Sequence, residues 1–452
     1  MQRAGAIILI STIVLLYMGC RSDEKAQPSP YAYAADQSAE VSQAWMGLLI
    51  EMDRYTKGYR PAPIARALAY MNLAAYEACM KGMPSYKSLS HLYPDLEIPA
   101  ALEGKDYHWP TVVNAVYATL FEHFFPSDAF LDGHADTYLF KMVELAQDFD
   151  DTFREQVGGE IFKRSSDHGK AVAEAFWEWS KSDPFGHNAY LNPSPSTYEP
   201  PVGPGLWAPT PPDYRPARFP NWGKVRTFAI QSQQKVAPPP LTFSQQATSP
   251  FYAQALAVRN AVLNLKFSEQ WVAEFWSDDF EGVTFSPAVR WISITHQVLE
   301  KENANLELAL YTYAKVSLAL HDAVVACWHS KYLYNVERPV SYIQRVIQND
   351  WLPHWDKTPA FPAYPSGHST MGAAAAEVLS HIFGYDYAMT DNSHADRQDF
   401  YGMPRSFASF YDMAFENAYS RLYLGVHFQM DCDAGLEMGF AVGRKINDMP
   451  FK

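Results

Sequence analysis

Residues 420–431 read SRLYLGVHFQMD, a stretch in which Arg421, His427 and Asp431 stand in an apolar and aromatic background. A helix or strand places charged groups in such surroundings only when something pairs with them, because an unpaired buried charge is costly. His427 precedes Asp431 by four residues, so the carboxylate can reach one imidazole nitrogen and hold the other pointing outward. The stretch therefore predicts a buried polar site whose remaining partners lie elsewhere in the chain.

A second segment, WHSKYLYNVERPVSY at 328–342, supplies two more cations. Lys331 and Arg338 are seven residues apart, a spacing that puts both on one face of a continuing helix. Arg338 precedes Pro339, however, and a residue before proline favours extended geometry. We therefore expect the helix to end there, with Arg338 projecting from its rim.

A third segment, FPAYPSGHSTMGAAAAEVLSHIF at 361–383, predicts a helix that begins at Ser366 and Gly367. Such a small-residue start exposes backbone N–H groups that suit an oxyanion, and His368 falls in the first turn. Taken singly, these residue types are weak signals. Together, the three segments combine three cations, a hydroxyl, a glycine amide and two histidines, a set that matches a highly charged oxyanion.

The composition limits the possible partners. The 452 residues are 48% hydrophobic and 15% aromatic, which indicates a folded protein with a large core. The formal net charge of −14 argues against nucleic acid as a partner, because binding a polyanion needs a basic surface. Any anion site must therefore be a local basic pocket.

The apolar pattern predicts an all-α protein. Residues recur at helical spacing over 38–84, 109–125, 129–148, 151–164, 168–182, 250–277 and 285–330, with almost no strand-like alternation. Residues 72–78 (NLAAYEA) also align with 317–323 (SLALHDA), although Ala-rich helices can produce such a match by composition. If the repeat is real, it predicts two related helical bundles.

Prolines cluster between residues 182 and 250 and forbid long helices there. One interpretation is a disordered linker. The other is an ordered loop packed over a surface, which the interleaved aromatic residues favour: Trp207, Phe219, Trp222 and Phe228.

The N-terminus resembles an export signal. The apolar run AIILISTIVLLYM at 6–18 follows Arg3 and ends at Gly19–Cys20, which is typical of a lipoprotein signal with Cys20 as the lipidated residue. An uncleaved anchor helix is the alternative. The sequence thus predicts export to the periplasm or cell surface, with any membrane contact made through the lipid anchor. The remaining cysteines, Cys79, Cys327 and Cys432, show no disulfide framework.

These patterns divide the chain into five parts. We expect a signal peptide at 1–20, a tether at 21–36, an N-terminal helical bundle at 37–181, the Pro-rich ordered region at 182–250, and a C-terminal bundle with the oxyanion site at 251–452.

The three polar segments together resemble the signature shared by vanadium-dependent haloperoxidases, acid phosphatases and type 2 phosphatidic-acid phosphatases. Further segments, such as GLWAPTPP at 205–212 and AEFWSDD at 273–279, are similar to the two-bundle bacterial and fungal haloperoxidases. The lipoprotein-like start, the length and the motif context most resemble bacterial iodoperoxidases. The resemblance implies a chloroperoxidase-like all-α fold with two bundles related by duplication.

The resemblance also implies a cofactor, orthovanadate, with His427 as the vanadium ligand and Asp431 orienting that histidine. Lys331, Arg338, Arg421, Ser366 and Gly367 would hold its oxygens. His368 would take a proton from hydrogen peroxide, and Lys331 would polarise the bound peroxide. The implied partners are hydrogen peroxide, a halide and organic acceptors.

Three questions stay open at this stage. An acid phosphatase with His427 as its nucleophile would use the same atoms, and a non-catalytic oxyanion binder is a third reading. Trp328 and Phe361 resemble the chloroperoxidases and iodoperoxidases and predict an apolar halide and peroxide pocket that favours iodide, with bromide possible; simple packing is the alternative. Asp278 and Asp279 either orient an arginine or lie in an exposed loop, and His321 and His329 have no role in the signature.

Overall fold

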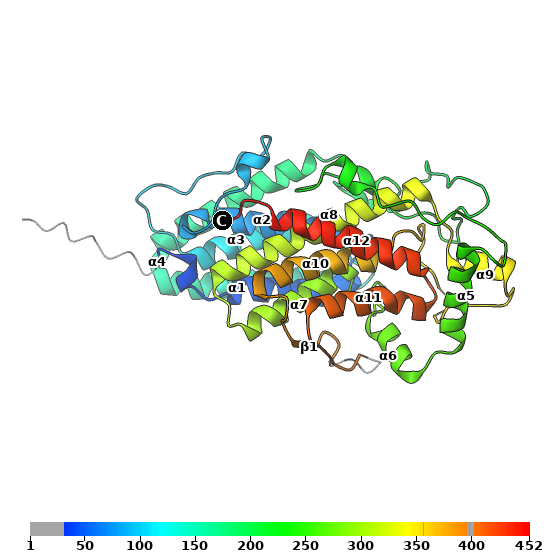
Figure 1. Cartoon of the computed structure of the whole chain (residues 1–452). Helices are drawn as coiled ribbons and strands as arrows, with labels where there is room; N and C mark the ends of the chain where they lie inside the picture. Colours follow the sequence, from blue (N-terminus) through cyan, green and yellow to red (C-terminus); the bar gives the residue numbers. More distant parts are fainter. Residues whose placement is uncertain (1–30, 356, 396, 398–401) are drawn as a thin grey trace, which may run out of the picture.

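The computed structural model describes residues 31–452 except 356, 396 and 398–401, and its long helices lie side by side along one dimension of the molecule (Figure 1). The expected signal peptide and Cys20 lie outside the described residues. The C-terminus lies at the opposite end of the helices from α5 and α9 (Figure 1). No helix in the described part of the chain is long and apolar enough to cross a membrane.

The α-helices and strands of the described residues have the following bounds: α1 Glu40–Met52, α2 Pro63–Ala78, α3 Trp109–Phe124, α4 Ala135–Lys181, α5 Pro250–Leu263, α6 Phe267–Phe275, α7 Pro287–Lys301, α8 Leu306–Tyr334, α9 Pro339–Val346, α10 Gly367–Phe383, β1 Met389–Asp391, β2 Arg405–Phe407, α11 Phe410–Leu424 and α12 Gln429–Asn447. Short 3₁₀ segments connect them: Ala34–Asp36, Asp53–Tyr55, Met80–Gly82, Ser90–Leu92, Ser127–Ala129, Ala189–Leu191, Trp222–Lys224 and Ser232–Lys235. The expected all-α class is confirmed, since the two short antiparallel strands are the only sheet in the described residues.

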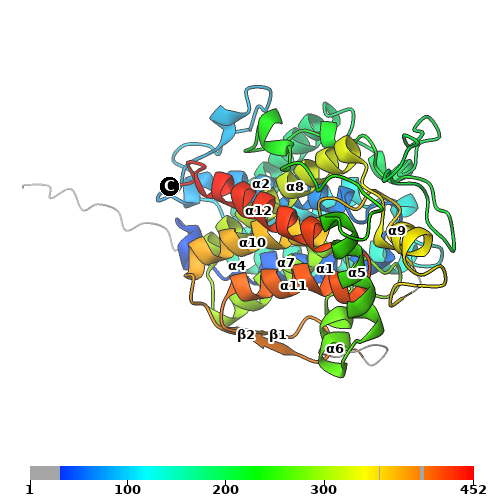
Figure 2. The same cartoon turned by 45° about the vertical axis from the view of Figure 1, so that its right-hand side comes forward.

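The helices before the Pro-rich segment, α1–α4, form a first unit, and the helices after it, α5–α12, form a second unit. The two units pack against each other through α2 and α8, and Figure 2 shows α10, α11 and α12 in front of the first unit. Asn72 on α2 donates a hydrogen bond from Nδ2 to Ser317 Oγ on α8 at 2.9 Å. These are the two positions that the sequence repeat aligns. Equivalent residues meet in this way when an approximate two-fold axis passes between the two helices, so the contact supports a duplication of the unit.

A glycine in the left-handed region interrupts the helical path in each of the two units. The sequence predicts separate helices at 129–148, 151–164 and 168–182, whereas the structure has one assigned helix, α4, broken at Gly158 with φ 76°. In the second unit Gly425, with φ 78°, separates α11 from α12. Glycine adopts this left-handed region without the clash of a Cβ. In the second unit, the break is where the chain brings His427 into the site.

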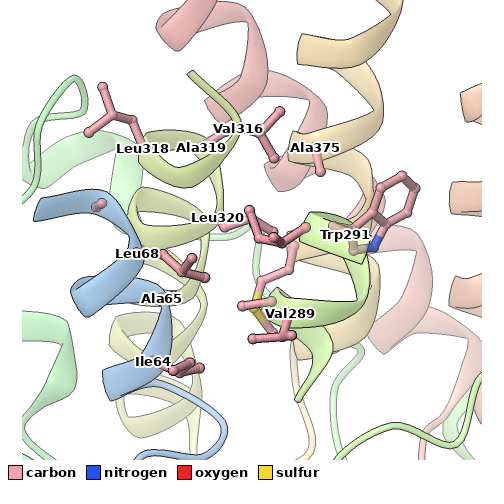
Figure 3. Close-up of a cluster of buried hydrophobic side chains, with 14 of the residues drawn as sticks. Ile64, Ala65, Leu68, Val289, Trp291, Val316, Leu318, Ala319, Leu320 and Ala375 are labelled. Carbon is pink, nitrogen blue, oxygen red and sulfur yellow. The ribbon is translucent and has the colours of Figure 1, made fainter. Parts of the chain in front are cut away.

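The core lies between the two units. Figure 3 shows Ile64, Ala65 and Leu68 of α2 beside α8, with Val289 and Trp291 of α7 on the other side near Ala375 of α10. All of these side chains are at most 1% exposed. Small alanines at the contacts let the helices approach closely, and burial of the large apolar side chains supplies most of the stabilisation.

The Pro-rich segment is packed onto the second unit. Trp207, Trp222, Phe219 and Phe228 are buried. The carboxylate of Asp322 on α8 accepts hydrogen bonds from the backbone N–H groups of residues 228, 229 and 230 at 2.8, 2.8 and 3.1 Å. The neighbouring His321 Nε2 contacts the carbonyl oxygen of Arg226 at 2.7 Å. These bonds fix a segment that also forms part of the site.

The N-terminal residues also pack. Within the expected tether, Ala34 is fully buried, Trp109 Nε1 donates to Ala32 O at 3.2 Å, and Asn305 Nδ2 donates to Ala35 O at 3.0 Å. The described end of that segment is thus part of the folded body. Cys79, Cys327 and Cys432 are buried free thiols.

We expect Asp322→Ala to release the Pro-rich segment, because three backbone donors lose their acceptor. The free energy of unfolding, measured with urea, should fall by about 1–3 kcal/mol. Limited proteolysis should speed up within residues 226–231. Glu307→Ala on the same helix is the control, and equal behaviour of the two variants would contradict the role assigned to Asp322.

Candidate active site

The three polar segments meet at one end of the second unit. Helix α8 ends at Tyr334, and Asn335 follows with a left-handed φ of 48°. Arg338 is the extended residue before α9, with ψ 152°, as its place before Pro339 predicts. It therefore does not continue the helix of Lys331. Ser366 precedes α10, and His427 lies between α11 and α12.

Lys331 is fully buried, and its side-chain hydrogen bonds among the described residues go to carbonyl oxygens. Its Nζ donates to Pro362 O and Ala363 O, both at 2.9 Å. Burial lowers the pKa of Lys331 to about 7. A buried ammonium with so little compensating charge attracts an anion.

Arg338 and Arg421 are the other two buried cations. Arg338 Nε donates to Phe361 O at 3.0 Å and Nη1 donates to Val426 O at 2.9 Å, whereas Nη2 has no hydrogen-bond partner among the described residues. Arg421 Nε donates to Ser420 Oγ at 3.0 Å, and Nη2 donates to Trp276 O. Burial lowers the pKa of each arginine to about 10, so both remain charged.

The hydrogen bonds of His427 define its tautomer. Nδ1 lies 2.9 Å from Asp431 Oδ2, and Nε2 lies 3.2 Å from Arg338 Nη1. A guanidinium can only donate, so the lone pair is on Nε2 and the proton is on Nδ1, directed at the carboxylate. Asp431 Oδ2 also accepts from Phe428 N at 3.0 Å, which fixes the carboxylate at the start of α12. Burial and the nearby cations hold the pKa of His427 well below its usual value.

His368 faces Arg421 in the same manner. Its Nε2 lies 3.2 Å from Arg421 Nη1, which again places the lone pair on Nε2. Burial and Arg421 lower the pKa of His368 well below its usual value. The ring is therefore neutral in the free protein and able to accept a proton.

The other predicted residues surround this group. Ser366 Oγ accepts from Ser369 N at 3.4 Å, and Gly367 is the first residue of α10, so its N–H has no partner within the helix. A Cβ built at Gly367 would lie 3.3 Å from the Trp328 ring. The rings of Trp328 and Phe361 pack with their centroids 4.8 Å apart, and Lys331 Nζ lies 5.2 Å from the Phe361 centroid.

An ionic network missed by the sequence analysis lies behind Arg421. Asp278 is 3% exposed, so the exposed-loop alternative is wrong for this residue. It lies 3.5 Å from Arg290 Nη1, and Arg290 Nη2 lies 2.8 Å from Asp391. Burial raises the pKa of Asp278 to about 7, against the opposing effects of Arg290 and Arg421. Asp279 instead pairs with Arg60 of the first unit at 3.3 Å.

A cavity of about 330 Å³ leads to the site and has walls from both units. Its inner wall contains Trp328, Phe361, Gly367, His368, Arg421 and His427. Its outer wall contains Arg60 and Pro61 from the first unit, Arg215 and Arg218 from the Pro-rich segment, and Trp355 and Lys357 from the chain before α10. The two histidines with signature positions are thus reached from outside, whereas His321 and His329 are absent from this wall.

The residues fit a tetrahedral oxyanion. Donors dominate the site, one buried guanidinium nitrogen of Arg338 has no partner, and the nearby carboxylates Asp431 and Asp278 both have pKa values raised by burial. Positive charge is therefore in excess, and an anion would offset it. The lone pair of His427 Nε2 faces the guanidinium of Arg338. The chain is thus a helical protein with a buried pocket whose donors are suited to an oxyanion.

Comparisons with known proteins agree with this class. Residues 311–450 match the family model of the second helical-bundle domain of vanadium chloroperoxidase. Vanadium chloroperoxidase of Curvularia inaequalis is 24% identical over 491 residues, which covers 87% of this chain and 79% of that protein. The crystal structure described as the first bacterial vanadium-dependent iodoperoxidase superimposes with a TM-score of 0.78 at 27% identity and covers 91% of this chain and 96% of that one. A holo-type bacterial vanadium-dependent chloroperoxidase shares the fold, with a TM-score of 0.64 at 16% identity over 94% of this chain and 96% of its own. Over most of its length the chain is thus similar to vanadium-dependent haloperoxidases, and residues 311–450 match their second helical-bundle domain.

We expect Asp431→Ala to weaken vanadate binding by about 10–100-fold, because His427 loses the acceptor that fixes its Nδ1 proton and its ring orientation. Calorimetric titration measures the affinity. The ¹⁵N signals of His427 should also show some proton on Nε2. Asp431→Asn keeps an oxygen that can accept both hydrogen bonds, so its vanadate affinity should fall less than that of Asp431→Ala. Glu437→Ala on α12 is the control, and an Asp431→Ala affinity within twofold of the parent would contradict this role.

The low pKa of Lys331 predicts that anion binding depends on pH. Below pH 7 the free protein already carries the Lys331 proton, whereas above pH 7 it has lost it. A bound oxyanion favours the charged amine, so binding at pH 8 must take up a proton, and affinity must fall as pH rises through 7. Tungstate, which keeps one charge state over this range, is the probe. Calorimetry in buffers of different ionisation enthalpy should show that tungstate binding takes up protons in the parent and fewer protons in Lys331→Met. Equal proton uptake by the two proteins would assign the proton to another group.

Proposed function

We propose that this enzyme binds orthovanadate and uses hydrogen peroxide to oxidise iodide. The observation that carries the proposal is the buried group of Lys331, Arg338 and Arg421 around the lone pair of His427 Nε2. The names of two relatives, a vanadium chloroperoxidase and a vanadium-dependent iodoperoxidase, support halide oxidation with vanadium. Vanadate, when bound, would supply a Lewis-acidic centre that activates peroxide while the oxidation state of vanadium stays unchanged.

The residues divide the work of holding this anion. His427 Nε2 would be the ligand atom, because Asp431 holds the ring with that nitrogen facing Arg338. Arg338, Arg421 and Lys331 would neutralise the oxygens. The Ser366 hydroxyl and the Gly367 N–H are further donors at the start of α10, where the helix dipole also favours an anion.

His368 is the acid–base group. Its neutral ring has the lone pair on Nε2, so this atom can remove a proton from incoming hydrogen peroxide. Overall, hydrogen peroxide, iodide and one proton give hypoiodous acid and water: the O–O bond breaks, and iodide loses two electrons to the peroxide oxygens. His368 can return the proton to the oxygen that leaves as water. Arg421 keeps the ring in place through Nη1.

Lys331 would act on the reacting oxygen by its charge. Bonds to two carbonyl oxygens hold Nζ in place, and a nearby anion raises its pKa, so the amine is protonated when the cofactor is present. A fixed positive charge beside the reacting oxygen makes that oxygen more electrophilic toward iodide.

The aromatic wall supports iodide as the preferred halide. Trp328 and Phe361 pack together beside Lys331 and line the inner cavity. Iodide is the halide that loses its hydration most easily and is the most readily oxidised, so an apolar wall disfavours it least. The 27% identical relative is named an iodoperoxidase, which supports the same choice.

We expect the purified protein to oxidise iodide in the presence of peroxide only after vanadate is added. His427→Ala should lower this rate by about 10³-fold, since it removes the ligand atom. On the same sample, p-nitrophenyl phosphate hydrolysis tests the phosphatase alternative, which uses the same histidine as a nucleophile. Ester hydrolysis by the vanadate-free protein, inhibited by vanadate and without iodide oxidation, would overturn the proposal.

A further inference from the structure

The outer half of the cavity contains cationic side chains that vanadate binding does not use. Arg60 comes from the loop before α2, Arg215 and Arg218 from the Pro-rich segment, and Lys357 from the chain before α10. Three separate parts of the fold therefore converge on one opening. In a protein with a net charge of −14, this is a local concentration of positive charge.

These cations are only partly compensated. Arg60 is 3% exposed; its Nε pairs with Asp279 at 3.3 Å, whereas Nη2 has no hydrogen-bond partner among the described residues. Arg218 donates from Nη2 to Arg60 O at 2.9 Å, and its Nε is also without a partner among those residues. Burial lowers the pKa of Arg218. Besides Asp279, the carboxyl groups of Asp278 and Glu281 line the cavity, and burial raises the pKa of Asp278 to about 7, so some capacity for an anion remains.

The exposed cations are held loosely. Arg215 Nε and Lys357 Nζ share the exposed carboxylate of Asp213, at 4.0 and 3.6 Å. Arg215 Nη2 also donates to Thr358 O at 3.3 Å. Surface pairs at such distances contribute little, so both side chains can turn toward a ligand at low cost.

An aromatic surface lies in the same wall. Phe280 and Trp355 pack edge to face with their centroids 4.3 Å apart, and both line the cavity and are half-buried. The cavity volume of about 330 Å³ is far larger than a halide ion requires and is in the range of sites for small organic molecules. Cations beside an aromatic pair are suited to a ligand with both an anionic group and a ring.

We propose that the outer half of this cavity binds an aromatic carboxylate, such as a hydroxyaryl acid, as the organic acceptor of halogenation. The ring lies against Phe280 and Trp355, and the carboxylate is bound by Arg218 with Arg215 and Lys357. The halogenation step rests on the proposed function, whereas binding of the acid does not. The acceptor is thus held in the cavity through which hypoiodous acid leaves.

The chemistry of the step is electrophilic substitution. The ring of the phenol attacks the iodine of hypoiodous acid, so a C–I bond forms and the O–I bond breaks with its electron pair on oxygen. The ring carbon then loses its proton, and the proton and hydroxide leave as water. Hypoiodous acid is the only oxidant needed, and the proposed function supplies it.

Binding of 4-hydroxyphenylacetate and of its neutral amide to the vanadate-free protein tests the site, with calorimetry as the readout. We expect the acid to bind about tenfold more tightly than the amide, because only the acid meets the cations. This preference should persist with saturating vanadate, since the acid and the cofactor occupy different halves of the cavity. Displacement of the acid by vanadate in simple competition would place its carboxylate on the inner cations and overturn the proposal.

Two variants locate the contact. Arg218→Gln should remove most of the preference for the acid and leave amide affinity within twofold. Lys357→Gln should reduce the preference for the acid over the amide by a smaller factor. Because Lys357 is exposed, this variant tests the site even if Arg218→Gln fails to fold. Lys163→Gln on α4 removes the same charge far from the cavity and is the matched control. An acid preference that is absent in the parent, or unchanged in both cavity variants, would contradict the site.

This test is separate from that of the proposed function. Selective binding of the acid without vanadate-dependent iodide oxidation would leave the binding site standing and refute the oxidation chemistry. Iodide oxidation without selective binding of the acid would support the oxidation chemistry and refute the binding site. If both hold, the KM for iodination of the acid should rise in Arg218→Gln relative to that for the amide.

Discussion

The structure depends on an excess of positive charge buried at one end of the second unit. Lys331, Arg338 and Arg421 are at most 3% exposed and are bonded mainly to carbonyl oxygens. Removing these charges from water costs free energy, and burial lowers all three pKa values. In the proposed function, a bound oxyanion would offset this cost. Burial and the same cations hold the pKa values of His368 and His427 well below their usual value, so both rings are neutral and each has a free lone pair.

The duplicated fold supplies the rigidity that this site requires. Helices α2 and α8 pack at the centre, and Asn72 bonds to the residue that the repeat aligns with it. Only the second unit has the signature, but the first unit contributes Arg60 and Pro61 to the cavity wall. The Pro-rich segment, fixed by Asp322, adds Arg215 and Arg218 to the cavity wall. The site is therefore a product of the whole chain, although its chemistry lies in one unit.

Much of the inner site was predictable because its residues occur in short, ordered motifs. The four-residue spacing of His427 and Asp431 predicts the observed 2.9 Å contact, and the position of Arg338 before proline predicts its extended backbone. The helical class follows from apolar periodicity. The sequence could not predict the pairing of Asp278 with Arg290, because no motif connects the two residues. It could not predict the convergence of Arg60 with Arg218 either, because these residues are far apart in the chain. The break of α4 at Gly158 was also missed, since its flanking residues retain a helical pattern.

The most direct test of the account is a crystal structure of the protein soaked with vanadate. The account predicts vanadium bonded to His427 Nε2, with its oxygens within hydrogen-bond distance of Lys331, Arg338 and Arg421. His368 should lie beside the oxygen that faces the cavity. Vanadium bound at another position, or an oxyanion at this site with His427 turned away from it, would contradict the central claim that the buried cations and this one lone pair form the cofactor site.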